Sequence, residues 1–442
     1  MDALLSSLAQ IMRRSVGGSG EVTNFARLSG GANMESSSFD WAGQGYVLRR
    51  APSAAMMEGR AFGHDVEAAV VRAAHRAGVL APLIVGELAP EDGIGTGYIM
   101  ARVEAEVRPD KILAHPPAGL IGDIARELAL IHAIPPSDAL PVANTADMVA
   151  VLRERFIGYG GDRPVMALTL AWLEANIPPP APLVFLHGDF RMGNLMVAPD
   201  GLAAVLDWEL AHIGDAHEDL VWGCVNSWRF GHIDKPAFGI SDFATYWAAY
   251  EAHSGTAVDP ARFAFWLVFR TLWWGLCCLQ MADIWRSGAD KSLERAVIGR
   301  RASETEVDLL MLLEAEAPDA ERHKIARPRI AAAQTAGEPS AAELIEALAG
   351  WVSTDVRPSA QGRDKFMASV ALSALAILKR DVQGPQMGED LTLSSQLLAG
   401  DLTLASPGVL AQLKAGALAK LAIDQPQYSA LPVAIAAWCS DE

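Results

Sequence analysis

The stretch 184–197 constrains the fold of this chain more than any other, because short apolar runs there flank a fixed set of polar side chains. It predicts a strand, a tight polar loop that contains Asp189 and Asn194, and a second strand. A turn of Pro, Asp and Gly leads into another apolar run, 202–206, which is followed by Asp207. We therefore expect short strands to bring these three polar side chains to the same edge.

These three side chains suit phosphoryl transfer. That reaction needs a carboxylate that orients and deprotonates a hydroxyl, and oxygen ligands that hold Mg²⁺ on the phosphates. Asp189 suits the first role, and Asn194 and Asp207 suit the second, because Mg²⁺ prefers oxygen ligands and keeps several waters. A polar hairpin without chemistry is the simpler alternative, but the order and spacing of all three favour a catalytic site.

The spacing of the loop resembles a known family. His187-Gly188-Asp189, followed by Asn194, is similar to the catalytic loop of the aminoglycoside phosphotransferase and choline kinase-like family, the small-molecule branch of the protein kinase fold. The loop departs from protein kinases in having Gly188 in place of Arg. The metal motif departs as well, since Asp207 opens an Asp-Trp-Glu sequence and not Asp-Phe-Gly.

The resemblance implies an α+β fold with a small β-rich N-lobe and a mainly helical C-lobe, and it implies ATP and Mg²⁺ as cofactors. By the same resemblance Asp189 is the catalytic base, Asn194 and Asp207 are metal ligands, and Arg191 lies near the γ-phosphate. We expect His187 to brace the loop.

The N-terminal part predicts a sheet interrupted by a glycine-containing loop. Strands are expected at 22–28, 36–41, 46–50, 83–88 and 98–103, with a helix at 58–77. Gly30 and Gly31 lie in the first loop, where small residues let backbone amides approach phosphates.

The family places a cation on the third strand and pairs it with a helix Glu. Arg49 and Glu67 stand at those positions, with Arg in place of the kinase Lys. Arg50 is the alternative cation, although strand alternation points it to the other face. The strand 98–103 corresponds to the hinge between the lobes, so the backbone groups of Ala101 and Val103 are the candidates for binding adenine.

The longest apolar stretch, 263–281, contains Arg270 near its middle. A central Arg is costly in a bilayer, so we expect a buried helix. The surrounding region is rich in aromatic residues and corresponds to the place where the family builds its acceptor pocket. The stretch has no acidic residue, which disfavours a polycationic aminoglycoside and favours an acyl or other apolar group.

Composition narrows the classes of partner and the cellular location. The 442 residues carry a formal net charge of −17, which argues against nucleic acid and anionic membranes. The hydrophobic fraction of 51% predicts a large buried core over two to three domains. The 4 cysteines lack zinc spacing, and an acidic start with Arg13 and Arg14 after the first apolar residues is atypical of a signal peptide. We therefore expect a cytoplasmic protein.

Four segments are expected along the chain: an N-lobe at 1–103, a C-lobe at 104–325, a linker at 326–339 and an all-helical accessory domain at 340–442. The last segment resembles a helical domain of unknown function that accompanies kinases of this branch. It contains no catalytic constellation, so we interpret it as a packing or oligomerisation module that would support a homodimer. Regulation of the kinase, or help in holding an acyl substrate, is the alternative.

The predicted function is ATP-dependent phosphorylation of a hydroxyl on a small molecule. The accessory domain makes the chain resemble hydroxyacyl-CoA kinases related to the phosphotransferase part of certain acyl-CoA dehydrogenases, so a 4-hydroxyacyl-CoA is the leading acceptor. The alternatives are an aminoglycoside, a sugar or a choline-like alcohol. A non-catalytic pseudokinase scaffold is a further alternative, which the substitution of Lys by Arg49 favours and the intact catalytic set opposes.

Overall fold

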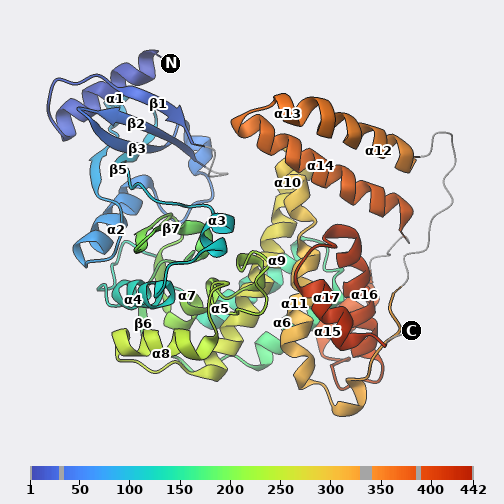
Figure 1. Ribbon diagram of the computed structural model, residues 1–442. Coiled ribbons are helices and arrows are strands. Elements are labelled where there is room, and N and C mark those ends of the chain that lie inside the picture. The colour runs from blue at the N-terminus through green and yellow to red at the C-terminus, as the bar shows by residue number, and fades with distance from the viewer. Residues whose placement is uncertain (1, 29–33, 329–340, 385–389, 441–442) are drawn as a thin grey trace.

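The computed structural model describes residues 2–28, 34–328, 341–384 and 390–440. The first lobe is a five-stranded antiparallel sheet in the order β1-β2-β3-β5-β4, with one helix on each face (Figure 1). Its elements are α1 Asp2–Ser15, β1 Thr23–Arg27, β2 Glu35–Trp41, β3 Gln44–Ala51, α2 His64–Arg76, β4 Ile84–Glu87 and β5 Thr96–Ala101. All five expected strands are present.

The period-two alternation of the strands separates the two faces of this sheet. On one face, Leu48 of β3 and Ile99 of β5 pack in a core with Ile11 of α1. On the other face, Tyr98 of β5 joins a core that contains Val70 of α2 and continues into the second lobe. The strand β3 therefore presents successive side chains to opposite sides, as strand geometry requires.

Helix α2 begins later than the sequence predicted. The expected helix started at residue 58, but Gly59 has a φ of 78°, in the left-handed region, and the chain reaches helical geometry only at His64. Gly63 is extended and forms the N-cap. A short 3₁₀ helix, Ala54–Met57, precedes this turn.

The second lobe is mainly helical and holds two small antiparallel sheets. Its helices are α3 Pro109–Ala114, α4 Leu120–His132, α5 Thr145–Gly158, α6 Pro164–Ala175, α7 Ala216–Trp222, α8 Phe243–Ser254, α9 Pro260–Ser287, α10 Leu293–Gly299 and α11 Ala302–Leu313. Its strands are β6 Leu183–Leu186, β7 Leu195–Ala198, β8 Gly201–Val205 and β9 His212–Asp215. The strands on either side of the 187–194 loop do not pair with each other: β6 pairs with β9, and β7 pairs with β8.

Helix α9 is long and apolar enough to cross a membrane by length and composition, but 78% of its most apolar window is buried inside the protein. Asp259 caps its first turn by accepting from the Ala261 amide at 2.9 Å, and Gly288 ends it in the left-handed conformation. Arg270 near its middle is 3% exposed. The prediction of a buried helix is confirmed.

The C-terminal helical region, defined here as residues 341–440, divides into two parts (Figure 1). Its helices are α12 Ala341–Trp351, α13 Arg357–Ser359, α14 Gly362–Gln383, α15 Leu391–Ala399, α16 Val409–Asp424 and α17 Ala430–Trp438. Helices α12 and α14 form an antiparallel pair that touches α10, whereas α15–α17 pack on α6 and α11 and share the core of the second lobe. Ile325, after α11, forms an isolated β-bridge with Cys439 at the end of this region.

Ile11→Ala tests the role of α1 as a cover for the N-lobe sheet. Ile11 is fully buried, so the variant should lose about 2–5 kcal/mol in the free energy of unfolding. Urea unfolding of Ile11→Ala and of Gln10→Ala, whose side chain is exposed on the same helix, measures the difference. Equal stability of the two variants would contradict this packing.

Candidate active site

The loop between β6 and β7 is braced by His187, as expected. Its Nε2 lies 3.0 Å from the carbonyl oxygen of Leu206, and its Nδ1 accepts the Asp189 amide at 3.1 Å. Burial lowers the pKa of His187, so the ring is neutral at pH 7 with its proton on Nε2. The imidazole thus joins the catalytic loop to the end of the strand that precedes Asp207.

A buried carboxylate anchors the start of the same loop. Asp219 of α7 is fully buried and accepts the backbone amides of His187 at 2.6 Å and Gly188 at 2.8 Å. Burial opposes its ionisation, but the interaction with His132 and these amides outweighs burial and lowers the pKa of Asp219 to about 2.

Gly188 and Arg270 fix the loop from the opposite side. Gly188 has a φ of 81°, and a Cβ atom there would lie 2.1 Å from the carbonyl oxygen of Leu210, so no other residue fits without rearrangement. The Gly188 carbonyl accepts a hydrogen bond from the Arg270 guanidinium of α9, which also pairs with Glu218 at 3.4 Å. The charge inside the apolar helix therefore holds the catalytic loop.

The carboxylate of Asp189 is held by donors on both oxygens. Asn194 Nδ2 donates to Oδ2 at 2.6 Å, and Arg191 Nε donates to Oδ1 at 2.9 Å. Trp222 Nε1 of α7 also donates to Oδ1. The side chain is 13% exposed, so Asp189 is oriented in a site that is largely shielded from solvent.

Asn194 and Asp207 lie side by side with oxygen atoms suited to Mg²⁺. The Leu206 amide donates to the Asn194 carbonyl at 2.8 Å, which places the following residue, Asp207, next to Asn194. Because Asn194 Nδ2 is taken by Asp189, its Oδ1 is the atom left for a metal. Asp207 adopts a φ of 66°, which is unusual for a non-glycine residue and turns its carboxylate into the cavity between the lobes. This oxygen set fits Mg²⁺.

Arg49 lies opposite, at the centre of an acidic cluster. Its Nη2 contacts Asp207 Oδ1 at 2.7 Å and Glu209 Oε2 at 2.6 Å, and its Nε lies 3.2 Å from Glu67 Oε1. Burial works against the charge, but these three carboxylates outweigh it and raise the pKa of Arg49. The structure therefore brings Arg49 and Glu67 together. Arg50 faces the other side of the sheet and pairs with Glu35 at 2.8 Å.

Several residues of the site were missed by sequence reasoning. Glu209 also binds Arg60 at 2.9 Å, and Tyr98 donates its hydroxyl to Glu67 at 2.9 Å. Burial and the neighbouring Asp207 raise the pKa of Glu209. Glu209 is two residues from Asp207 in the Asp-Trp-Glu motif, and that proximity is a signal that would have found it. Trp222 and Arg60 have no such local signal.

A cavity of about 590 Å³ between the lobes connects these groups to the hinge. Its lining includes Arg49, Asn194 and Asp207 at one end and residues 100–104 at the other. The Ala101 amide donates to the Leu83 carbonyl at 2.9 Å, which leaves the Ala101 carbonyl as its candidate group for adenine. The predicted Gly30 and Gly31 lie outside the described residues.

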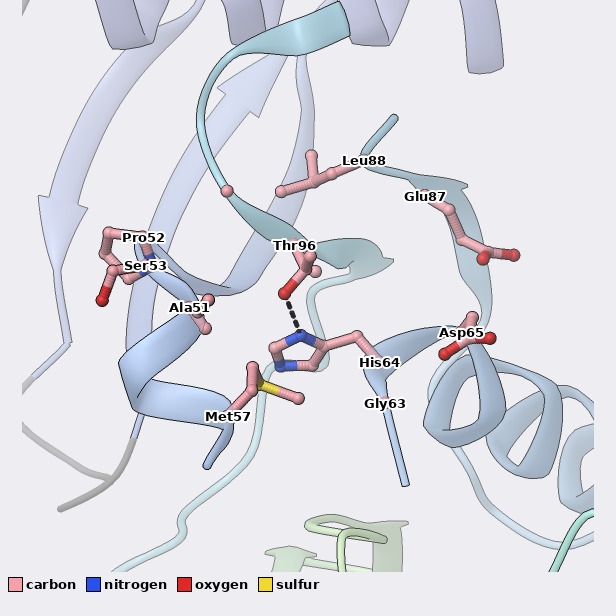
Figure 2. Close-up of a pocket in the computed structure, with 13 residues that line it drawn as sticks. Ala51, Pro52, Ser53, Met57, Gly63, His64, Asp65, Glu87, Leu88 and Thr96 are labelled. Carbon is pink, nitrogen blue, oxygen red and sulfur yellow. Dashed lines mark hydrogen bonds between the residues drawn. The ribbon is translucent and has the colours of Figure 1, made fainter. Parts of the chain in front are cut away.

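A second cavity, of about 450 Å³, lies in the N-lobe between the end of β3, the start of α2 and the start of β5 (Figure 2). His64 Nδ1 lies 3.0 Å from the Thr96 hydroxyl at this cavity. Burial, with Arg49 and Arg60 nearby, lowers the pKa of His64 to about 4, so the ring is neutral at pH 7. The charged residues that line it, Asp65 and Glu87, are both acidic, so the cavity does not suit phosphates.

Indole rings and arginines surround Asp189 on the side away from the hinge. Arg191 stacks over Trp228 with its guanidinium carbon 4.4 Å from the ring centroid, and Arg270 stacks over Trp222 at 4.3 Å. Phe230, two residues after Trp228, is 43% exposed. Most of the other aromatic residues of this region are buried in the core. The residues that touch Asp189 are thus aromatic, amide or cationic.

The two lobes, the cavity at the hinge and the braced loop define a protein kinase-like fold with a phosphotransfer site. The model of the phosphotransferase enzyme family matches residues 24–266, and the chain belongs to that family. It is an ATP-dependent small-molecule kinase. A domain of unknown function, DUF6285, matches residues 358–428. The expected family and the expected accessory domain are both confirmed.

The chain is similar to several known proteins. A crystal structure of a "putative aminoglycoside phosphotransferase" from Ralstonia eutropha is 24% identical. The match covers 68% of this chain and 95% of that one with a TM-score of 0.53, which supports the fold alone. Acyl-CoA dehydrogenase family member 10 of Mus musculus is 38% identical over 64 residues. The Arabidopsis thaliana protein named "Probable acyl-CoA dehydrogenase IBR3" is 33% identical over 78 residues. These stretches cover 14% and 16% of this chain, and 6% and 10% of the two relatives.

Asp219→Asn tests the loop anchor through its pH dependence. The pKa of Asp219 is lowered to about 2, so its stabilising effect is fully present above the ordinary Asp pKa and is lost as the pH falls toward 2. The variant should be less stable than the wild type at pH 7 by about 2 kcal/mol. Urea unfolding at several pH values should show this gap closing below about pH 4. A gap that is independent of pH would contradict the assignment.

Proposed function

We propose that this kinase uses Mg²⁺·ATP to phosphorylate a hydroxyl group of a small acyl acceptor, with a 4-hydroxyacyl-CoA as the leading candidate. The observation that carries the proposal is the contact between Asn194 Nδ2 and Asp189 Oδ2 at 2.6 Å. Through this contact the Asn194 nitrogen orients the Asp189 carboxylate that would receive the acceptor hydroxyl. The Asn194 amide oxygen stays free beside Asp207.

In this mechanism the adenine ring lies at the hinge and the phosphates extend along the cavity toward Arg49. Phosphate oxygens compete with Asp207 and Glu209 for the Arg49 guanidinium, which both carboxylates contact in this structure. Asn194 and Asp207 would hold Mg²⁺, which neutralises charge on the phosphates when bound. Glu67 keeps Arg49 on the cleft side of the sheet by its ion pair at 3.2 Å.

Asp189 orients the acceptor hydroxyl and receives its proton as the phosphoryl group transfers. Donors from Asn194, Arg191 and Trp222 fix the carboxylate. Oδ1 accepts from both Arg191 and Trp222, whereas Oδ2 accepts from Asn194 and keeps a lone pair for the acceptor. Burial of the loop excludes water, which limits hydrolysis of ATP in place of transfer.

The surroundings of Asp189 support an acyl or anionic acceptor over a polycation. An aminoglycoside site would present free carboxylates, whereas Glu218 pairs with Arg270 and Glu304 pairs with Arg301 at 2.9 Å. Indole rings offer apolar contact, and Arg191 offers a cation at the acceptor side. The short similarities to two proteins named as acyl-CoA dehydrogenases point to the same class of acceptor.

Two substitutions separate the roles of the carboxylates. Asp189→Ala should lower turnover about 10²- to 10⁴-fold and leave the Kd for Mg²⁺·ATP nearly unchanged, because the base acts on the acceptor. Asp207→Ala should weaken Mg²⁺·ATP binding itself. Isothermal titration and a coupled ADP assay measure both effects, and Asp200→Ala, in an exposed turn, is the matched control. Near-normal turnover in Asp189→Ala would remove Asp189 as the base.

An acceptor panel tests the substrate class. ADP release should depend on a hydroxyacyl-CoA and be absent with choline, sugars and an aminoglycoside. Release with one of the other acceptors would reassign the substrate within the same family. A thermal shift with Mg²⁺·ATP but no release on the panel would indicate a kinase whose acceptor lies outside the panel, and no thermal shift would favour the scaffold alternative.

A further inference from the structure

The C-terminal helical region reaches the phosphotransfer site through Tyr428, in the loop between α16 and α17. The Tyr428 hydroxyl donates to Asp308 Oδ2 at 2.6 Å and lies 3.4 Å from the Ser227 hydroxyl. Asp308 is on α11 and is 6% exposed, while Ser227 is 5% exposed. A residue within the domain of unknown function is therefore part of a buried polar cluster in the kinase lobe.

This cluster holds the 3₁₀ helix η4, Asn226–Trp228, against α11. Asn226 Nδ2 donates to Asp308 Oδ1 at 2.9 Å, and the Ser227 hydroxyl donates to Glu304 Oε2 at 3.3 Å. Asn226 and Tyr428 therefore bind the two different oxygens of the same Asp308 carboxylate. Two consecutive residues of η4 are thus fixed by carboxylates of α11, and Tyr428 completes the arrangement. Buried polar groups of this kind are costly to leave unpaired, which makes the arrangement specific.

The third residue of η4, Trp228, packs on both donors to Asp189 Oδ1. Arg191 stacks over the Trp228 ring at 4.4 Å, and the Trp222 ring meets it edge-on with centroids 5.3 Å apart. Arg191 and Trp222 both donate to Asp189 Oδ1. A displacement of η4 would therefore change the position of both donors to the proposed base.

We propose that Tyr428 is a positioning residue: by fixing η4 it sets Trp228, and through Arg191 and Trp222 it orients the Asp189 carboxylate. The C-terminal helical region then acts as a built-in part of the catalytic apparatus, where the sequence favoured a packing or oligomerisation module. The consequence for turnover rests on the proposed function, whereas the link from Tyr428 to Trp228 does not.

Tyr428→Phe removes the hydroxyl and keeps the ring. The matched control is Lys420→Met, which breaks another contact between the same two regions: Lys420 of α16 binds Glu306 of α11 at 3.2 Å, two residues before Asp308. Both variants loosen the attachment of the C-terminal helical region to α11, but only Tyr428 contacts the groups that hold η4. A general loss of stability would therefore affect both variants alike.

The first readout does not require activity. In protein labelled with 5-fluorotryptophan, the ¹⁹F signals of Trp222 and Trp228, among 12 tryptophans, are assigned from Trp→Phe variants. Tyr428→Phe should shift the Trp228 and Trp222 signals, and Lys420→Met should leave them in place. Unchanged signals in Tyr428→Phe, or equal shifts in both variants, would overturn the proposal.

The second readout is kinetic. Tyr428→Phe should lower kcat roughly 3- to 20-fold, with the KM for ATP nearly unchanged, because the hinge and Arg49 are untouched. In an Arg191→Ala background the same substitution should lower kcat by a smaller factor, since the path through Arg191 is already broken and only the path through Trp222 remains. An equal loss of kcat in both backgrounds would overturn the proposal. If the wild type phosphorylates no acceptor, the proposed function fails, and the ¹⁹F signals still decide whether Tyr428 sets Trp228.

Discussion

The hydrogen bond from Asn194 to Asp189 joins the two halves of the site. The carboxamide has one donor end and one acceptor end, so the donation at 2.6 Å to the Asp189 carboxylate leaves its oxygen for the position next to Asp207. One side chain therefore relates the proposed base to the residues proposed to face the phosphates. The braces of the loop, His187, Asp219 and Arg270, maintain this relation by fixing the backbone on either side.

Charge balance across the cavity gives Arg49 a second role. In this structure its guanidinium, together with that of Arg60, offsets part of the negative charge of Asp207, Glu209 and Glu67, which would otherwise repel one another in a partly buried space. Arginine suits this position because its planar fork reaches several carboxylates at once, and the same fork binds phosphate oxygens. Arg49 in place of Lys therefore goes together with Glu209 of the Asp-Trp-Glu motif. A guanidinium can contact Glu209 as well as Asp207 and Glu67, whereas the single ammonium of a Lys would reach fewer carboxylates.

Local sequence patterns predicted the features that depend on residues close together in the chain, such as strand faces and loop spacing. Strand alternation placed Arg49 and Arg50 on opposite faces of β3, and the loop spacing placed Asp189 beside Asn194. The contacts of Trp222 with Asp189 and of Arg270 with Gly188 were not predicted, because the partners lie 33 and 82 positions apart and no local period encodes such contacts. Apolar periodicity likewise predicted α15–α17 but not that α6 and α11 cover them, because a pattern gives the apolar face and not its partner.

The most direct measurement is a crystal structure of the protein with Mg²⁺ and a non-hydrolysable ATP analogue. The account predicts that the metal is bound by Asn194 Oδ1 and the Asp207 carboxylate, that Arg49 leaves Asp207 for phosphate oxygens, and that Asp189 faces the γ-phosphate. A nucleotide bound outside the cavity between the lobes, or a metal held without Asn194 and Asp207, would contradict it.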